Sequence, residues 1–304
     1  MMNIRKISLF LLFAFALSWA IGGAIYLLDI DMKSATAMVM VIGYMFMPAL
    51  SVLLVQKFIF REQMLQPLRI SFKLNWFFLW ALLSPLILVF LATVVGFILP
   101  GVIYSPDMSG IMEMFKDKMT PEDLVKMQQS IDKLPIHPIW ISIMQGLIAA
   151  VSINALAAFG EELGWRGFLL NEFKNLSFFR ASLAIGIIWG LWHAPIILMG
   201  HNYSQHPQWG VLFMTIFCTL FTFIFNYVTI KAKSVIAACV MHGSLNAFWG
   251  ITFMLSSGGN DLIIGIAGIA GFISLTLTIV LLFIYDKWIS REGLMAKTIG
   301  ESYT

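Results

Sequence analysis

Long apolar runs separated by short polar segments make up most of this chain. Eight of these runs reach the roughly 20 residues that a helix needs to cross a hydrocarbon core about 30 Å thick. They cover residues 7–28, 34–55, 75–100, 139–172, 179–199, 209–230, 234–255 and 261–284. The pattern predicts an all-α, polytopic membrane protein: a single transmembrane domain over residues 1–304, built as a bundle of about eight transmembrane helices.

The composition agrees with that class and excludes a soluble globular protein. Hydrophobic residues make up 60% of the 304 positions and charged residues 12%, with 26 Phe and 10 Trp, and the mean hydropathy is +0.87. Such values are typical of membrane proteins. The two cysteines, Cys218 and Cys239, both lie in apolar runs, which predicts small buried residues and not a disulfide or a thiolate metal site.

The first apolar run resembles a signal peptide at its start. Two basic residues precede it, and Ser18-Trp19-Ala20 is similar to a cleavage site. The run continues to Leu28, which is longer than the usual core of a signal peptide, so an uncleaved span is the favoured interpretation.

Basic residues are distributed unequally between the loops and indicate the orientation. Fourteen Lys and Arg lie on one side and five on the other, and four of these five share a single long loop, where the positive-inside rule has least force. Both termini are therefore expected in the cytoplasm. The expected external loops lie around residues 29–33, 101–138, 200–208 and 256–260, and the expected location is the inner membrane of a bacterial cell.

The long external loop contains the signature of a short amphipathic helix. Thr120-Pro121-Glu122-Asp123 supplies a hydroxyl cap, a Pro in the first turn and early acidic residues. Apolar residues then recur at helical spacing up to Leu134. We expect this helix to lie on the bilayer or to cap the bundle.

One apolar run contains three ionisable side chains close together, within Gly160–Leu170. Glu162 and Arg166 are four residues apart, so an α-helix puts them on one face, where they can form an ion pair. Glu161 projects in another direction and has no partner on its own helix. Such a cluster either marks the water-exposed end of a span or faces the bundle interior or a water-filled cavity, where it indicates a functional site.

Two later runs contain further polar groups. His193 lies in the fifth run, and His242 and Asn246 lie four residues apart in the seventh, where they share a helical face. Counted from the predicted cytoplasmic ends of their helices, Glu161, His193 and His242 lie roughly 20, 20 and 14 Å deep at 1.5 Å per residue. A lone His in an apolar helix is commonly a hydrogen-bonded core residue, but the similar depths of the three groups favour one shared layer.

Two kinds of hydrolytic site can be built from a carboxylate, two imidazoles and an amide in one layer. In the first, the desolvated Glu161 carboxylate takes a proton from water, while His and Asn donors stabilise an oxyanion. This mechanism requires no cofactor. In the second, Glu161, His193 and His242 bind a zinc ion that activates the water. The spacing differs from the HExxH signature, so three separate helices would have to hold the ion, and the sequence leaves zinc open.

Three short motifs occur in order on successive late helices: Glu161-Glu162-x-x-x-Arg166, Trp189-x-x-x-His193 and His242-x-x-x-Asn246. Each motif is weak by itself. The ordered set resembles the type II CAAX prenyl endopeptidases and the related bacterial CPBP, or Abi, proteins, and it falls in a core of about residues 145–250. The resemblance implies an eight-helix intramembrane protease that hydrolyses a peptide bond of a membrane-associated peptide or protein.

The resemblance also implies a role for each motif residue. Glu161 activates water, His193 helps to position it, and His242 forms the oxyanion site with Asn246. The ion pair of the first motif supports the structure. One departure is Trp189, which stands where the prenyl endopeptidases usually have Phe.

The expected partners are the lipid bilayer and a membrane-associated or lipidated peptide substrate, with no nucleic acid. Bacterial relatives are linked with bacteriocin immunity and peptide maturation. A different class of function, a non-proteolytic bacteriocin-immunity scaffold or a proton-coupled transporter, also uses intramembrane Glu and His. Transporters often carry repeats with interrupted helices in both halves, whereas here the first three spans contain no Asp, Glu, Lys, Arg or His well inside them, which favours the hydrolase.

Overall fold

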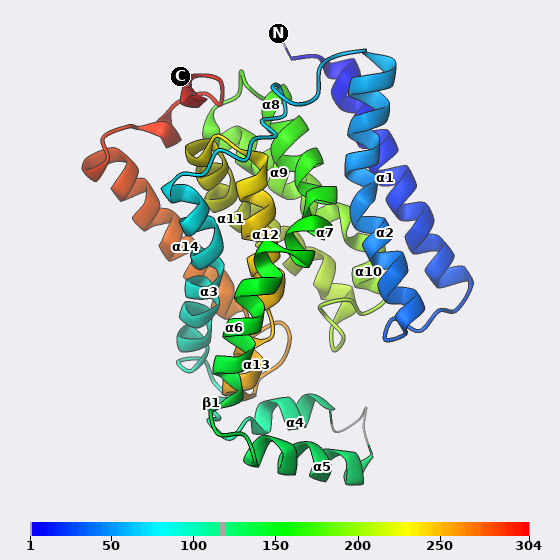
Figure 1. Ribbon diagram of the computed structural model, residues 1–304, viewed down its shortest axis with the longest axis vertical. Coiled ribbons are helices and arrows are strands. Elements are labelled where there is room, and N and C mark those ends of the chain that lie inside the picture. Colours follow the sequence, from blue (N-terminus) through cyan, green and yellow to red (C-terminus); the bar gives the residue numbers. More distant parts are fainter. Residues whose placement is uncertain (1, 116–119, 304) are drawn as a thin grey trace.

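Long helices lie side by side in one bundle in the computed structural model, which describes residues 2–115 and 120–303 (Figure 1). Within these residues, six helices are long and apolar enough to cross a membrane: Ile4–Leu27, Ala35–Ile59, Trp76–Gly96, Pro207–Ala232, Val235–Leu255 and Ile269–Ile289. A bent pair of helices over residues 138–172 raises the number to seven if it forms one span. The predicted class, an all-α polytopic membrane protein, is confirmed.

The helical elements follow one another with short connections. In chain order they are α1 (Ile4–Leu27), α2 (Ala35–Val52), η1 (Leu53–Ile59), α3 (Trp76–Gly96), α4 (Ser109–Phe115), α5 (Pro121–Asp132), α6 (Pro138–Val151), α7 (Ile153–Glu162), η2 (Leu163–Leu169), α8 (Leu170–Glu172), α9 (Phe178–Trp192), α10 (Ala194–Leu198), α11 (Pro207–Ala232), α12 (Val235–Phe248), α13 (Ile251–Leu255), α14 (Ile269–Ile284), η3 (Tyr285–Ile289), η4 (Leu294–Ala296) and η5 (Glu301–Tyr303). Two short strands, β1 (Val102–Tyr104) and β2 (Ser256–Gly258), pair antiparallel and join two of the predicted external loops.

Two spans predicted as single helices are interrupted. The run 139–172 bends by 49° between α6 and α7, where Ser152 leaves the helical conformation. At 1.5 Å per residue a straight helix of that length would far exceed the bilayer core, so the break shortens it. The run 179–199 divides into α9, with 15 residues, and α10, with five, because Pro195 cannot continue the hydrogen bonding of α9. Both pieces are shorter than a full span, so the predicted count of eight stays a prediction.

The last predicted span also begins later than expected, at Ile269 instead of residue 261. Gly265 has a φ of +81° and therefore cannot be part of a right-handed helix. The preceding residues form turns that lead into the N-terminus of α14.

Both chain ends lie at one end of the bundle, and α4 and α5 lie at the other (Figure 1). At the end near the termini, the buried Lys6 ammonium lies 2.6 Å from carboxylate oxygens of both Glu62 and Glu172. In the opposite region, the predicted loop helix is confirmed as α5, whose cap Thr120 accepts from the backbone N–H of Asp123. This arrangement is compatible with the loop charges, and the cytoplasmic orientation of the termini stays a prediction.

The C-terminal segment folds back onto the same end of the bundle. The Ile299 N–H donates to the Leu176 carbonyl over 2.9 Å, and the Arg69 guanidinium lies 3.2 Å from the centre of the Tyr303 ring. Burial raises the pKa of Tyr303 to about 12. The segment therefore contributes a half-buried aromatic contact to the loops that connect the helices.

Helices α9 and α11 pack with their backbones in close approach. A Cβ atom at Gly186 would lie 2.4 Å from Thr219 Cα, and one at Gly190 would lie 2.4 Å from Thr215 Cα. Glycines four residues apart form the small-residue face that allows transmembrane helices to approach closely. This contact sets the position of α9, which carries His193 at its end.

We expect Gly186→Val to destabilise the protein by about 1–3 kcal/mol, because the added side chain overlaps the backbone of α11. Thermal unfolding of the purified protein in detergent measures the loss. Gly23→Val is the matched control, since no heavy atom lies within 4 Å of a Cβ at Gly23. Equal losses in the two variants would contradict the role of the α9–α11 contact.

Candidate active site

The two adjacent glutamates lie in the last turn of α7 and are buried inside the bundle. Glu161 is 2% exposed and Glu162 is 0% exposed. Every residue from 160 to 170 is buried. Of the two interpretations of this cluster, the structure therefore favours the bundle interior over the water-exposed end of a span. The next segment, η2, is a π-helix, a form that often occurs at functional sites.

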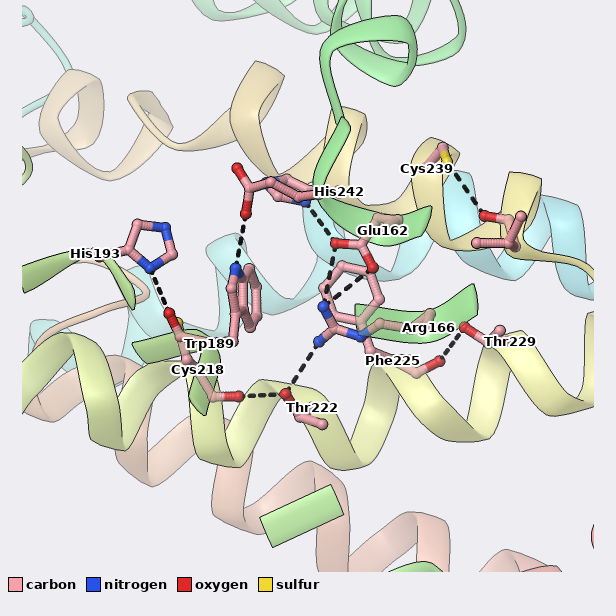
Figure 2. A network of polar contacts seen from close by, with 12 residues as sticks. Glu162, Arg166, Trp189, His193, Cys218, Thr222, Phe225, Thr229, Cys239 and His242 are labelled. Carbon is pink, nitrogen blue, oxygen red and sulfur yellow. Dashed lines mark hydrogen bonds and ion pairs between the residues drawn. The ribbon is translucent and has the colours of Figure 1, made fainter. Parts of the chain in front are cut away.

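Glu162 and Arg166 form the expected ion pair. Arg166 Nη1 lies 3.0 and 3.1 Å from the two carboxylate oxygens of Glu162, and Arg166 Nη2 donates to Thr222 Oγ1 over 3.0 Å (Figure 2). The guanidinium also lies between two aromatic rings, 4.4 Å from the centre of Trp189 and 4.0 Å from that of Phe225. The charge is thus held by an anion, a hydroxyl and two ring faces, which compensates for its burial.

Glu162 has a second partner, which the sequence spacing does not reveal. His242 on α12 places Nδ1 2.7 Å from Glu162 Oε1 (Figure 2). The imidazole is buried. Glu162 therefore joins the cationic side chain of its own helix to a histidine that is 80 positions away along the chain.

Glu161 has its partner on a different helix. The indole Nε1 of Trp189, on α9, donates to Glu161 Oε2 over 2.8 Å. The backbone carbonyl of Trp189 lies 2.8 Å from His193 Nδ1. A carbonyl is only an acceptor, so His193 carries a proton on Nδ1, and in the neutral ring Nε2 is left as an acceptor.

The helix break at His193 is held by residues of the first two helices. The Trp192 carbonyl accepts from the Tyr44 hydroxyl and, over 3.1 Å, from Trp19 Nε1. Trp192 Nε1 donates to Ser18 Oγ over 2.8 Å. Helices α1 and α2 thus fix the backbone next to His193, although their described residues contribute no Asp, Glu, Lys, Arg or His to the site.

Asn246 lies one turn after His242 on α12, as the spacing predicts, but its surroundings differ. Asn246 is exposed and His193 is half-buried, whereas Glu161, Glu162 and His242 are buried. Among the described residues, no hydrogen bond links Asn246 to the other site residues. The structure therefore joins five predicted residues through contacts around Trp189 and leaves Asn246 at the accessible edge.

The zinc alternative does not fit this arrangement. Within the described part of the chain, no three His, Cys, Asp or Glu side chains form a group that could hold a metal ion. Glu161, His193 and His242 belong to three helices and do not converge on one point as such a group, although the Nδ1 bonds of the two imidazoles leave both Nε2 atoms free. Cys218 and Cys239 are free and buried, as predicted. The reaction proposed for this site therefore uses no metal ion.

Two contacts at this site were not predicted from the sequence. The side-chain N–H of Trp189 holds Glu161, and its only sequence signal is the presence of Trp in the second motif. Thr222 on α11 holds Arg166, and no spacing pattern in the sequence connects these two residues. Both contacts cross between helices, so the periodicity of one helix cannot predict them.

Comparisons with known proteins match a family to this same region and also find a relative. Residues 140–248 match the family described as type II CAAX prenyl endopeptidase Rce1-like. CAAX prenyl protease 2 of Methanococcus maripaludis is 35% identical over 98 residues, which are 30% of this chain and 36% of that protein. The chain therefore spans about a third of the length of the curated relative that it matches. The matched region contains all three motifs, which confirms the resemblance inferred from them: residues 140–248 of this chain are similar to the Rce1-like family of type II CAAX prenyl endopeptidases.

Proposed function

We propose that this protein is an intramembrane endopeptidase that hydrolyses a peptide bond of a membrane-associated peptide or protein with a water molecule activated by Glu161. One observation carries the proposal. Glu161 is buried, and the cationic Arg166 and the potentially cationic His242 both bond to the neighbouring Glu162 and not to Glu161. Among the described residues, Glu161 forms no ion pair. A buried carboxylate without a bound cation keeps its capacity to accept a proton, as a general base requires.

The proposed reaction balances with the groups of the site. Glu161 takes one proton from water while the water oxygen bonds to the scissile carbonyl carbon. The carbonyl oxygen becomes an oxyanion, and the collapse of this intermediate breaks the C–N bond. The proton held by Glu161 passes to the leaving amine, so that the carboxylate is restored.

The hydrogen bonds support different roles for the two imidazoles. In neutral His193, Nε2 is an acceptor, which suits it to orient the attacking water. His242 faces the Glu162 carboxylate, which stabilises an imidazolium, and a protonated His242 can donate from Nε2 to an oxyanion. With His242 protonated, two carboxylates face one guanidinium and one imidazolium, so the buried cluster is neutral. Asn246, four residues after His242, supplies the second donor.

The substrate class is a lipidated or membrane-anchored peptide. Two of the proposed site residues are accessible, since His193 is half-buried and Asn246 is exposed, and the methanococcal relative is named a CAAX prenyl protease. We propose that the protein acts in the inner membrane of a bacterial cell with both termini in the cytoplasm, an orientation that the distribution of basic residues supports.

The proposal is tested by incubating the purified protein with membrane peptides in detergent and identifying new peptide termini by mass spectrometry. We expect the parent to create a new terminus. Asn246→Ala should lower kcat by about 10² to 10³, the usual effect of removing one oxyanion donor. A parent protein that cleaves none of the peptides, while it binds them, would instead support a non-proteolytic role.

A further inference from the structure

Trp189 contacts four polar side chains of the site from a single position on α9. Its indole N–H bonds to Glu161, and its carbonyl bonds to His193. The Arg166 guanidinium lies over its ring at 4.4 Å, and the His242 ring lies 5.6 Å away, centre to centre. Trp189 is only 2% exposed. No other described residue contacts all four of these groups.

We infer that Trp189 is the positioning residue of the general base: its N–H holds one oxygen of Glu161 so that the other oxygen is aimed at the attacking water. The inference rests on the proposed function. Donation from Trp189 engages Oε2, and we assign Oε1 as the oxygen that takes the proton. A Phe at position 189 could pack over Arg166 in the same way, but it has no hydrogen-bond donor for Glu161.

A fixed carboxylate matters because the last torsion of a glutamate side chain is broad. Without an anchor, the carboxylate plane rotates over a wide range of angles. A general base has to lie within hydrogen-bond reach of the proton that it removes, and a misplacement of about 1 Å can cost on the order of 10²-fold in rate. The N–H bond removes this rotation before substrate binds.

The indole ring is itself held in place by the ion pair of the first motif. Arg166 lies against the ring of Trp189 and against that of Phe225. The Phe225 ring also meets the Trp189 ring edge-on, at 5.7 Å and 88°. Glu162 holds the guanidinium from the other side. The chain of contacts therefore runs from Glu162 through Arg166 and Trp189 to Glu161, and connects the adjacent glutamates through space.

The test replaces Trp189 with β-(3-benzothienyl)alanine by nonsense suppression, because this analogue keeps the double ring and has sulfur where the indole has its N–H. We expect kcat per folded molecule to fall by roughly 10- to 100-fold with KM nearly unchanged, since one hydrogen bond to a charged group is lost. Trp189→Phe should change kcat in the same direction. Folded protein is quantified by gel filtration and thermal unfolding, so that a purely structural effect would appear there and not in kcat.

Trp192 offers a matched control on the same helix. Its N–H donates to Ser18 Oγ over 2.8 Å, the same distance as the bond from Trp189 to Glu161. The same analogue at position 192 removes an equally short bond that does not reach the carboxylate, and the loss of kcat should be clearly smaller than at position 189, because only the support of the backbone next to His193 is weakened. An unchanged kcat with the analogue at 189, or equal losses at 189 and 192, overturns the positioning role while the proposed function stands. A parent without peptidase activity overturns both.

Discussion

Glu161→Gln is expected to lower turnover by a factor on the order of 10² to 10⁴ while the protein stays folded. Gln has nearly the same size as Glu, and its amide oxygen can still accept the N–H of Trp189. It cannot accept a proton from water at neutral pH, so only the general-base step is lost. The measurement is kcat for peptide cleavage by the purified protein, together with its thermal unfolding.

Glu172→Gln is the control for this substitution. Glu172 lies in α8, eleven positions further along, and its partner Lys6 keeps a second carboxylate, that of Glu62. We expect the control to retain the parent kcat. Full activity in Glu161→Gln would refute the general-base role. A chelator should have no effect on the parent, and loss of activity with a chelator followed by recovery with zinc would contradict both the role and the site geometry.

Arg166→Ala is expected to destabilise the protein by about 3–5 kcal/mol, because the substitution leaves a buried carboxylate without its guanidinium. Glu162 is 0% exposed and would retain only His242 as a partner. The Trp189 ring would also lose the contact on one face. The amount of folded protein in membranes and the melting temperature in detergent measure the effect.

The Asp123–Lys126 pair of α5 provides the comparison. Its atoms are 3.7 Å apart, and its side chains are largely exposed. Lys126→Ala should therefore cost less than about 1 kcal/mol. If Arg166→Ala accumulated and melted like the parent, the buried pair would have no structural role.

The sequence by itself determined the class of the protein, the ion pair between Glu162 and Arg166, and the region that resembles the type II CAAX prenyl endopeptidases. In lipid, an apolar run of about 20 residues can form all its backbone hydrogen bonds within itself only as a helix. The transmembrane class therefore follows from composition and length. Glu162 and Arg166 meet because they are four apart on one helix. The cap at Thr120 likewise depends on residues three apart. Each of these features is local in the chain.

Only the tertiary structure decided how the polar groups are connected and where the long runs break. The bonds from His242 to Glu162 and from Trp189 to Glu161 span 80 and 28 positions. Such contacts depend on the rotation and depth of each helix relative to its neighbours. The rotation and depth of a helix depend in turn on its packing. At Gly186, for example, close contact with the backbone of α11 fixes the position of α9. Helical periodicity specifies which residues share a face, whereas the residue that this face meets is set by the other helices of the bundle.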